Sequence, residues 1–324
     1  MKKKTFHIPI FVPHKGCPHD CVFCNQRKIT GRLKEMTYPE AQSIIEEHLN
    51  TIEKNNKPGT YHAEVAFFGG SFTAIEKDKQ TNLLSLANSY VSSGRIHGIR
   101  CSTRPDYITQ DILSNCKNHG LTAIELGVQS ACEDVLCLSQ RGHTFKDVIK
   151  ASNLIKSNGF ELGLQMMTGL PGDTHEKSIE TALKIAMLKP KNVRIYPTLV
   201  MDGTYLMQMY KDGKYLPQSL FDAVILSADV AEIFIKSGIE ILRIALQTTD
   251  GVNADTVIGP YHPAFAELVY TEIYKRKIEK EIKEKNLSNC VFKIKSDKPS
   301  QVIGHKGANK KYFKEKYNID IKII

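Results

Sequence analysis

Short apolar segments with the composition of β-strands alternate with longer amphipathic segments along most of the chain. The strand-like segments are residues 6–12, 64–70, 99–103, 122–128, 160–167, 192–200 and 239–244. The segments between them have the apolar spacing of helices and include residues 39–54, 79–91, 144–159 and 175–189. This order predicts parallel strands joined by crossover helices. Six or seven such units predict an α/β fold with a partial or full (β/α) barrel, whose active site lies at the carboxyl ends of the strands.

The composition sets limits on the kind of protein. No run of about 18 uncharged apolar residues exists, so we expect neither a membrane span nor a membrane partner. The basic start of the chain lacks the apolar stretch and cleavage site of a signal peptide, so we expect a cytoplasmic protein. Eight cysteines are too few for a disulfide scaffold in 324 residues. Five scattered ones are expected to be buried, reduced thiols: Cys101, Cys116, Cys132, Cys137 and Cys290.

Positive charge is concentrated at the end of the chain. Residues 271–324 contain 15 Lys and Arg against 7 Asp and Glu, whereas the remaining residues contain 29 against 28. Nearly all of the net charge of +9 therefore lies in this segment, which suggests a polyanionic partner. The alternative is a solvated helix over residues 273–285, because Glu and Lys alternate there at pairing distance.

The same segment predicts a second domain. After a long charged helix and a strand at residues 290–295, residues 298–324 have the pattern of a short helix, a glycine-rich turn, a helix and a strand. We therefore expect a core barrel domain over residues 1–262 and a small basic α+β domain over residues 263–324.

Three closely spaced cysteines follow the first strand-like segment. Cys17, Cys21 and Cys24 have the spacing Cys-x3-Cys-x2-Cys, and thiolates are the soft ligands that hold iron–sulfur clusters. Three ligands on a four-iron cluster leave one iron open for a small molecule. The alternative is a zinc site completed by His14 or His19, but structural zinc sites usually pair two distant ligand groups, and the sequence has no second one.

This cysteine spacing resembles that of the radical S-adenosylmethionine (SAM) superfamily. The resemblance implies a [4Fe–4S] cluster and SAM as cofactors, with the open iron binding the amino and carboxylate groups of SAM. One electron, from a donor such as flavodoxin or ferredoxin, then yields a 5′-deoxyadenosyl radical that abstracts hydrogen from a substrate. Cys17, Cys21 and Cys24 would hold the cluster, and Phe23 could shield it from water.

The resemblance also implies where SAM binds, because candidate contacts follow successive strands. Gly69 and Gly70 take the place of the turn that meets the SAM ammonium group in relatives, with Ser71 at its acidic position. Arg141 is similar to the residue that pairs with the SAM carboxylate, since guanidinium offers a planar charged fork. The other candidate contacts are Thr103 at the barrel mouth, Gln129 on SAM, Gln165 near the ribose and Tyr196 on the strand that lies against adenine.

Further motifs narrow the resemblance. The segments "ELGVQS", "RGHT", "MMTGLPG", "IYPTLV" and "DGTYLMQMYKDGKY" are similar, from about Phe11 to Tyr215, to the radical SAM half of the Elongator catalytic subunit, which modifies transfer RNA (tRNA) using acetyl-CoA. No acetyltransferase segment follows, so we expect a stand-alone bacterial form. His262, in "GPYHPAFAELV", is expected to cap a helix.

The glycine-rich turn near the end of the chain resembles the core of a KH domain. Such a domain clamps a nucleic-acid backbone on a Gly-x-x-Gly loop, here Gly304, His305, Lys306 and Gly307. Phosphates could approach the exposed amides of this loop, and Lys306, Lys310 and Lys311 would add positive charge. The alternative is a small domain that only packs against the barrel.

Three functional hypotheses remain open at this stage. The first is a radical SAM enzyme that acts on RNA, in particular tRNA. The second is a radical SAM enzyme that acts on a protein or small molecule, with the basic domain as a docking module. The third is a non-catalytic iron–sulfur protein that binds RNA.

Overall fold

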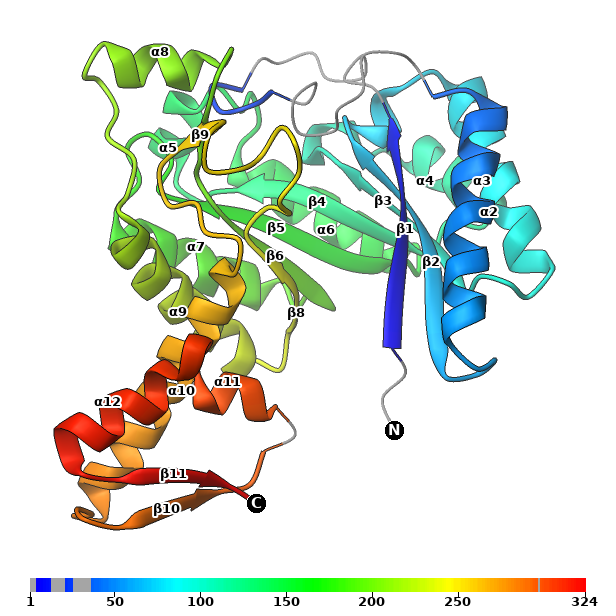
Figure 1. The fold of residues 1–324 in the computed structure, drawn as a ribbon. Coiled ribbons are helices and arrows are strands. Elements are labelled where there is room, and N and C mark those ends of the chain that lie inside the picture. Colours follow the sequence, from blue (N-terminus) through cyan, green and yellow to red (C-terminus); the bar gives the residue numbers. More distant parts are fainter. Residues whose placement is uncertain (1–3, 13–20, 26–35, 297) are drawn as a thin grey trace.

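The computed structural model describes residues 4–12, 21–25, 36–296 and 298–324. Its main sheet is parallel and has seven strands in the order β1-β2-β3-β4-β5-β6-β8. These strands are β1 (Lys4–Val12), β2 (Tyr61–Gly69), β3 (Gly98–Thr103), β4 (Ala123–Gln129), β5 (Glu161–Thr168), β6 (Asn192–Pro197) and β8 (Glu240–Ile244). Figure 1 shows the sheet curled into a half-barrel with β1 and β8 at its edges. The α/β barrel-type fold predicted from the sequence is therefore confirmed.

Each crossover between neighbouring strands contains a helix. In chain order these helices are α2 (Tyr38–Asn55), α3 (Lys77–Ser92), α4 (Gln110–Asn118), α6 (Phe145–Ser157), α7 (His175–Met187) and α9 (Leu220–Lys236). Polar N-caps fix where several of them begin, because a side-chain oxygen satisfies a free helical N–H group. Thr37 and Thr144 form complete capping boxes at α2 and α6.

The outer face of the half-barrel packs against these helices. The strands contribute alternate residues such as Val65, Ile99 and Ile124 to one hydrophobic core shared with the helices. Because side chains alternate along a strand, the residues between them point to the concave face.

Charged side chains form a buried network on the concave face. Arg100 donates from Nε to Glu64 Oε2 at 2.6 Å and from Nη1 to Glu125 Oε1 at 2.9 Å. Arg194 donates from Nε to Glu125 Oε2 at 2.6 Å. Burial alone would raise the pKa of Glu125, but Arg194 and Arg100 outweigh burial and lower the pKa to about 2. Glu125 is therefore ionised, and the network fills the floor of the half-barrel with paired charges.

Short elements surround the mouth of the half-barrel, at the carboxyl ends of the strands. They are η2 (Phe72–Ala74), η3 (Pro105–Tyr107), α5 (Glu133–Leu138), α8 (Tyr205–Lys211) and the antiparallel pair β7 (Val200–Met201) and β9 (Val257–Ile258). Each of these elements follows the carboxyl end of a strand of the sheet. The sequence predicts the cofactor contacts at these strand ends.

The last part of the chain forms a small tail around its own core. Its elements are β10 (Val291–Ile294), α11 (Pro299–Ile303), η4 (His305–Gly307), α12 (Ala308–Tyr317) and β11 (Asp320–Ile323). This is the predicted order of strand, short helix, glycine turn, helix and strand, and β10 pairs with β11 in parallel. Its hydrophobic core includes Phe292, Val302 and Phe313.

One helix joins the tail to the half-barrel. Phe265 and Val269, in the first turns of α10 (Phe265–Glu284), belong to the barrel core, whereas Ile278 and Ile282 belong to the tail core. The domain boundary at residue 263 remains a prediction, and α10 contributes to the cores on both sides.

Two sequence expectations concern the chain as a whole. Across the described residues, no helix is both long enough and apolar enough to span a membrane. Cys101, Cys116 and Cys132 are buried as predicted, but Cys290 is only half-buried. The prediction is wrong for Cys137, which is exposed in the last turn of the short helix α5.

Candidate functional site

Cys21 and Cys24 lie at the mouth of the half-barrel, after β1. Cys21 is buried and Cys24 is half-buried, and the Cys24 N–H donates to the Cys21 carbonyl at 2.9 Å in a tight turn. Val22 fixes this turn, because its N–H donates to the Ser139 carbonyl at 3.2 Å and its carbonyl accepts from the Leu206 N–H at 2.7 Å. The third predicted ligand, Cys17, lies outside the described residues, as do His14 and His19 of the zinc alternative.

Two arginines surround the Cys21 sulfur. Arg141 Nη1 lies 3.2 Å from Cys21 Sγ, and Arg104 Nη1 lies 3.9 Å from it. Asp106 accepts from Arg104 at 2.9 and 3.0 Å, which fixes that guanidinium group. Two positively charged groups therefore lie beside this sulfur. The sequence motifs did not predict this contact between Arg104 and Cys21.

Gln129 and Arg141 meet at a bulge in β4. Gln129 has a positive φ of 68°, and the pairing with β5 shifts between Gly127 and Gln129. Arg141 Nη2 donates to the Gly127 carbonyl at 2.7 Å, and a Cβ on Gly127 would lie 3.2 Å from that nitrogen. Glycine at this position therefore lets the guanidinium group approach the strand.

Two buried polar atoms at this bulge lack a partner within the described part of the chain. They are Oε1 of Gln129 and Nε of Arg141. A buried polar atom without a hydrogen bond costs roughly 1–3 kcal/mol, so such atoms mark a place where a ligand can supply the missing partner. An acceptor for Arg141 and a donor for Gln129 match the carboxylate and ammonium groups of SAM, and the residues present fit that cofactor.

His143 is a site residue that the sequence did not predict. Burial lowers the pKa of His143, and the nearby positive charges of Arg141 and Arg104 lower it further, to about 3. The imidazole is therefore neutral and adds no further positive charge to the mouth. The sequence feature that could have indicated His143 is its position in "RGHT", two residues after Arg141.

The predicted glycine turn lies at the end of β2, beside the end of β1. Val12, at the end of β1, pairs with Gly69, and the Gly70 N–H donates to the Val12 carbonyl at 3.3 Å. Gly69 has a φ of 105°, which favours glycine. Ser71 is buried directly after the turn. The turn is therefore fixed against the end of β1, the strand that precedes the cysteines in the sequence.

Thr103 has a partner within the protein. Its hydroxyl group lies 2.5 Å from that of Thr73 in η2, and both residues are buried. This hydrogen bond connects the end of β3 to the turn after β2, so a positioning role explains Thr103 at least as well as cofactor contact does.

Gln165 and Tyr196 lie on the concave face, next to the charged network. Gln165 Nε2 donates to Glu125 Oε2 at 2.9 Å and to Ser102 Oγ at 3.1 Å. Tyr196 is half-buried, and burial raises the pKa of its hydroxyl group. The predicted ribose and adenine contacts remain predictions, and the Gln165 amide nitrogen already has two partners.

Phe23 is half-buried between two small apolar clusters. One includes Leu206 and Tyr215 near α8, and the other includes Cys132 and Leu170. Its ring therefore fills space beside Cys24, in keeping with the predicted shielding role.

The Gly-x-x-Gly loop of the tail packs against α10. The His305 N–H donates to Thr271 Oγ1 at 2.8 Å, and His305 Nδ1 lies 2.9 Å from Glu267 Oε2. The Gly304 and Gly307 N–H groups donate to backbone carbonyls at 3.0 and 2.9 Å. The expectation of exposed amides is therefore wrong for His305 and both glycines, because α10, α11 and the loop itself supply their acceptors. Lys306, Lys310 and Lys311 still present their side chains on this surface.

The parallel half-barrel has a cysteine turn and two arginines at its mouth. Comparison with known families identifies the class of protein to which this arrangement belongs. Residues 11–185 match the family model of the radical SAM superfamily, and residues 190–275 match that of the radical SAM C-terminal domain. The chain belongs to the radical SAM superfamily. Members use a [4Fe–4S] cluster and SAM, so the predicted enzyme class and cofactors are confirmed. Neither the zinc alternative nor the non-catalytic alternative is supported.

The relatives narrow the class further. The chain is 30% identical to the tRNA uridine(34) acetyltransferase of Methanocaldococcus jannaschii, over 67% of this chain and 47% of that protein. It is 38% identical to Elongator complex protein 3 of Bos taurus, with the same two coverages. The chain thus spans about half the length of these curated relatives. An uncharacterised protein of M. jannaschii is 31% identical over 66% of this chain and 67% of its own length.

A solved structure shows the same fold. The archaeal Elp3 of Methanocaldococcus infernus superimposes with a TM-score of 0.65 at 24% identity, covering 89% of this chain and 64% of that one. The predicted resemblance to the radical SAM half of the Elongator catalytic subunit is confirmed.

Proposed function

We propose that this protein cleaves SAM reductively and modifies RNA, in particular tRNA, in the cytoplasm. The observation that carries the first part is the pair of buried atoms without a partner, Gln129 Oε1 and Arg141 Nε, beside Cys21. The second part is supported by the tRNA-modifying relatives and by the basic tail.

Each residue of the mouth has a defined task in this proposal. Cys17, Cys21 and Cys24 would hold the [4Fe–4S] cluster, which would supply the electron for the reductive cleavage of SAM. Arg141 pairs with the SAM carboxylate, since its guanidinium group is fixed by Gly127 and keeps a free donor. Gln129 accepts from the ammonium group, together with the turn at Gly69 and Gly70.

The surrounding residues position these groups and exclude water. Arg104 is fixed by Asp106 and keeps positive charge beside Cys21. Phe23 covers one side of the cysteine turn. An electron donor such as flavodoxin or ferredoxin would dock near this turn.

RNA would contact the tail through side chains. Among the described residues, Lys306 and Lys310 form no ion pair, so both can pair with phosphates. Lys311 lies 3.8 Å from Glu315, and both side chains are mostly exposed, so this weak pair can give way to a phosphate.

The occupied loop amides favour one second candidate function. If the tail does not clamp a nucleic-acid backbone, it can serve as a docking module for an enzyme that acts on a protein or small molecule. The two candidates share the SAM chemistry and differ only in the substrate.

The SAM chemistry is tested on protein reconstituted with iron and sulfide without oxygen. We expect bound iron and dithionite-dependent formation of 5′-deoxyadenosine from SAM. The Cys21→Ala variant should lose both, whereas the matched Cys137→Ala variant, which changes an exposed cysteine outside the site, should keep both. Normal 5′-deoxyadenosine formation by Cys21→Ala would contradict the proposal.

The substrate is tested by mass spectrometry of tRNA nucleosides from cells with and without the gene. A nucleoside that disappears without the gene and returns with the wild-type gene, but not with the Cys21→Ala gene, identifies the product. An unchanged nucleoside profile would favour the second candidate.

A further inference from the structure

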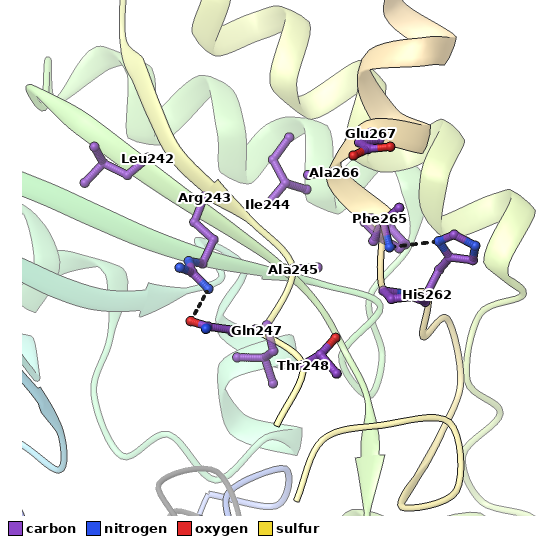
Figure 2. A pocket seen from close by; sticks show the side chains of 13 residues that line it. Leu242, Arg243, Ile244, Ala245, Gln247, Thr248, His262, Phe265, Ala266 and Glu267 are labelled. Carbon is purple, nitrogen blue, oxygen red and sulfur yellow. Dashed lines mark hydrogen bonds between the residues drawn. The ribbon is translucent and has the colours of Figure 1, made fainter. Parts of the chain in front are cut away.

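A cavity of about 560 Å³ lies at the carboxyl end of β8, the edge strand of the half-barrel. Residues 242–248 line one side, and residues 262–267, at the start of α10, line the other. Figure 2 shows Arg243 and Gln247 extending from the strand, with His262 and Glu267 on the side of the helix. Cavities of this size are typical of small-ligand sites. The mouth residues assigned above do not line it.

Arg243 differs from the other arginines of the concave face. It pairs in register with Arg194 on β6, so both side chains point to that face. Arg100 and Arg194 each donate to a buried carboxylate. Arg243 has no carboxylate partner within the described residues, and its side-chain hydrogen bond goes to Gln247 Oε1 at 3.4 Å. A half-buried guanidinium group that borders a cavity and pairs with no carboxylate favours an anionic ligand.

His262 provides a donor on the opposite wall. Its Nδ1 accepts from the Ala264 N–H at 3.0 Å, just before α10, but Ala264 is the N-cap residue and no side chain caps this helix, so the predicted capping role is wrong. In the neutral ring the proton is therefore on Nε2, which is left as a donor. Burial lowers the pKa of His262, and the nearby His305 and Lys306 lower it further, in keeping with the neutral form.

The Gly-x-x-Gly loop of the tail contacts two residues that line the cavity, His262 and Glu267. The rings of His262 and His305 contact edge to face, with centroids 5.3 Å apart. Glu267 also lines the cavity, and it lies 2.9 Å from His305 Nδ1, so its negative charge faces the loop histidine. Lys306 follows His305 in the chain, so a polyanion bound to Lys306 would lie near this cavity.

We infer that this cavity binds one nucleotide of the RNA strand that the tail holds, with Arg243 pairing with its phosphate and His262 Nε2 donating to it. The inference rests on the proposed RNA substrate and assigns the cavity as the link between the tail and the half-barrel. A free nucleotide carries the same phosphate group as a nucleotide within RNA. The experiment therefore has to distinguish RNA from a free nucleotide as the ligand.

The test measures binding of fluorescently labelled total tRNA by anisotropy over a range of salt concentrations. We expect the Arg243→Gln variant to bind about tenfold more weakly and its salt slope to fall by about 0.7 to 0.9, since one phosphate contact is lost. The Arg243→Lys variant should keep most of the slope, because the charge remains. Thermal unfolding of each variant shows whether the fold is intact.

The matched control is Lys236→Gln, which removes one positive charge at the end of α9, just before β8 begins. This variant should bind tRNA like the wild type. Equal affinity and slope for Arg243→Gln and the wild type would overturn the cavity inference and leave the proposed function standing. Failure of the wild type to bind tRNA would contradict the RNA substrate itself. If adenosine monophosphate binds in an Arg243-dependent way and tRNA does not bind, the cavity holds a free nucleotide, and the inference that it holds a nucleotide of RNA is contradicted.

Discussion

The mouth of the half-barrel and the glycine loop of the tail use their polar groups in opposite ways. At the mouth, Gln129 and Arg141 keep buried polar atoms without a partner among the described residues. In the loop, the His305 N–H and both glycine N–H groups already have acceptors within the protein. A ligand can therefore supply the missing hydrogen bonds at the mouth, whereas the loop amides need none and the loop can contact a partner through its side chains.

The charged floor of the half-barrel extends this comparison, and substitution there should have the largest effect on the free energy of unfolding. It resembles the loop, because its charges have partners. The Glu125→Gln variant should lose about 3–5 kcal/mol of unfolding free energy, since Arg194 and Arg100 would stay buried without a full partner. Urea unfolding measures the loss.

The control for this variant is Glu46→Gln, which breaks a surface pair with Arg95. It should cost about 0–1 kcal/mol. Similar losses for the two variants would show that the floor network is no more important than a surface ion pair.

Acid should weaken the stabilisation that the floor network provides. The pKa of Glu125 is about 2 in the folded protein, below its ordinary value of 4.5. The unfolded chain therefore takes up this proton at higher pH, so the stabilisation is present above about pH 4.5 and declines as the pH falls toward 2. Thermal unfolding between pH 6 and pH 3 should show a smaller decline for Glu125→Gln than for the wild type. Parallel declines would contradict this assignment.

The two loop glycines should respond unequally to substitution. Gly304 has φ 81° and ψ 161°, and a Cβ there would lie 2.8 Å from Thr271 Cγ2. Gly304→Ala should therefore cost about 2–3 kcal/mol. Gly307 has φ 79° but open space around it, so Gly307→Ala should cost about 1 kcal/mol. Amide hydrogen exchange in α11 and α12 measures both, and equal effects would show that the loop does not depend on its packing against α10.

The mouth itself should respond in ligand binding. Arg141→Gln should weaken SAM binding ten- to a hundredfold, because a charge-assisted hydrogen bond worth roughly 1.5–3 kcal/mol is lost. Calorimetric titration of the reconstituted protein with SAM measures this, and Arg95→Gln, which changes a surface arginine, is the control. Unchanged SAM affinity in Arg141→Gln would break the comparison, since the unpartnered atoms would then serve no ligand.

Local sequence patterns predict the architecture well because they reflect local physics. The strand–helix alternation gives the parallel half-barrel, and "VIGHKG" with its flanks gives the helix–turn–helix of the tail. The charged floor was missed, although Glu64, Arg100, Glu125 and Arg194 each interrupt an apolar strand. That interruption was the available signal.

Contacts between distant residues could not be predicted in this way. Arg141 and Cys21 are 120 positions apart, and Thr271 and His305 are 34 apart, so only the folded chain brings each pair together. For the same reason, the hydrogen bond between Thr103 and Thr73 and the two partners of Gln165 were not apparent from their motifs.

Helix α10 has a mechanical consequence, because its 20 residues are rooted in two hydrophobic cores. A straight helix of that length is about 30 Å long and resists bending, so it acts as a spacer of fixed length. The Gly-x-x-Gly loop packs on the first turns of this helix, at Thr271 and Glu267, so a polymer bound by the loop would meet the barrel at a set angle. Recognition would then depend on the position of a nucleotide along that polymer as much as on the identity of its base.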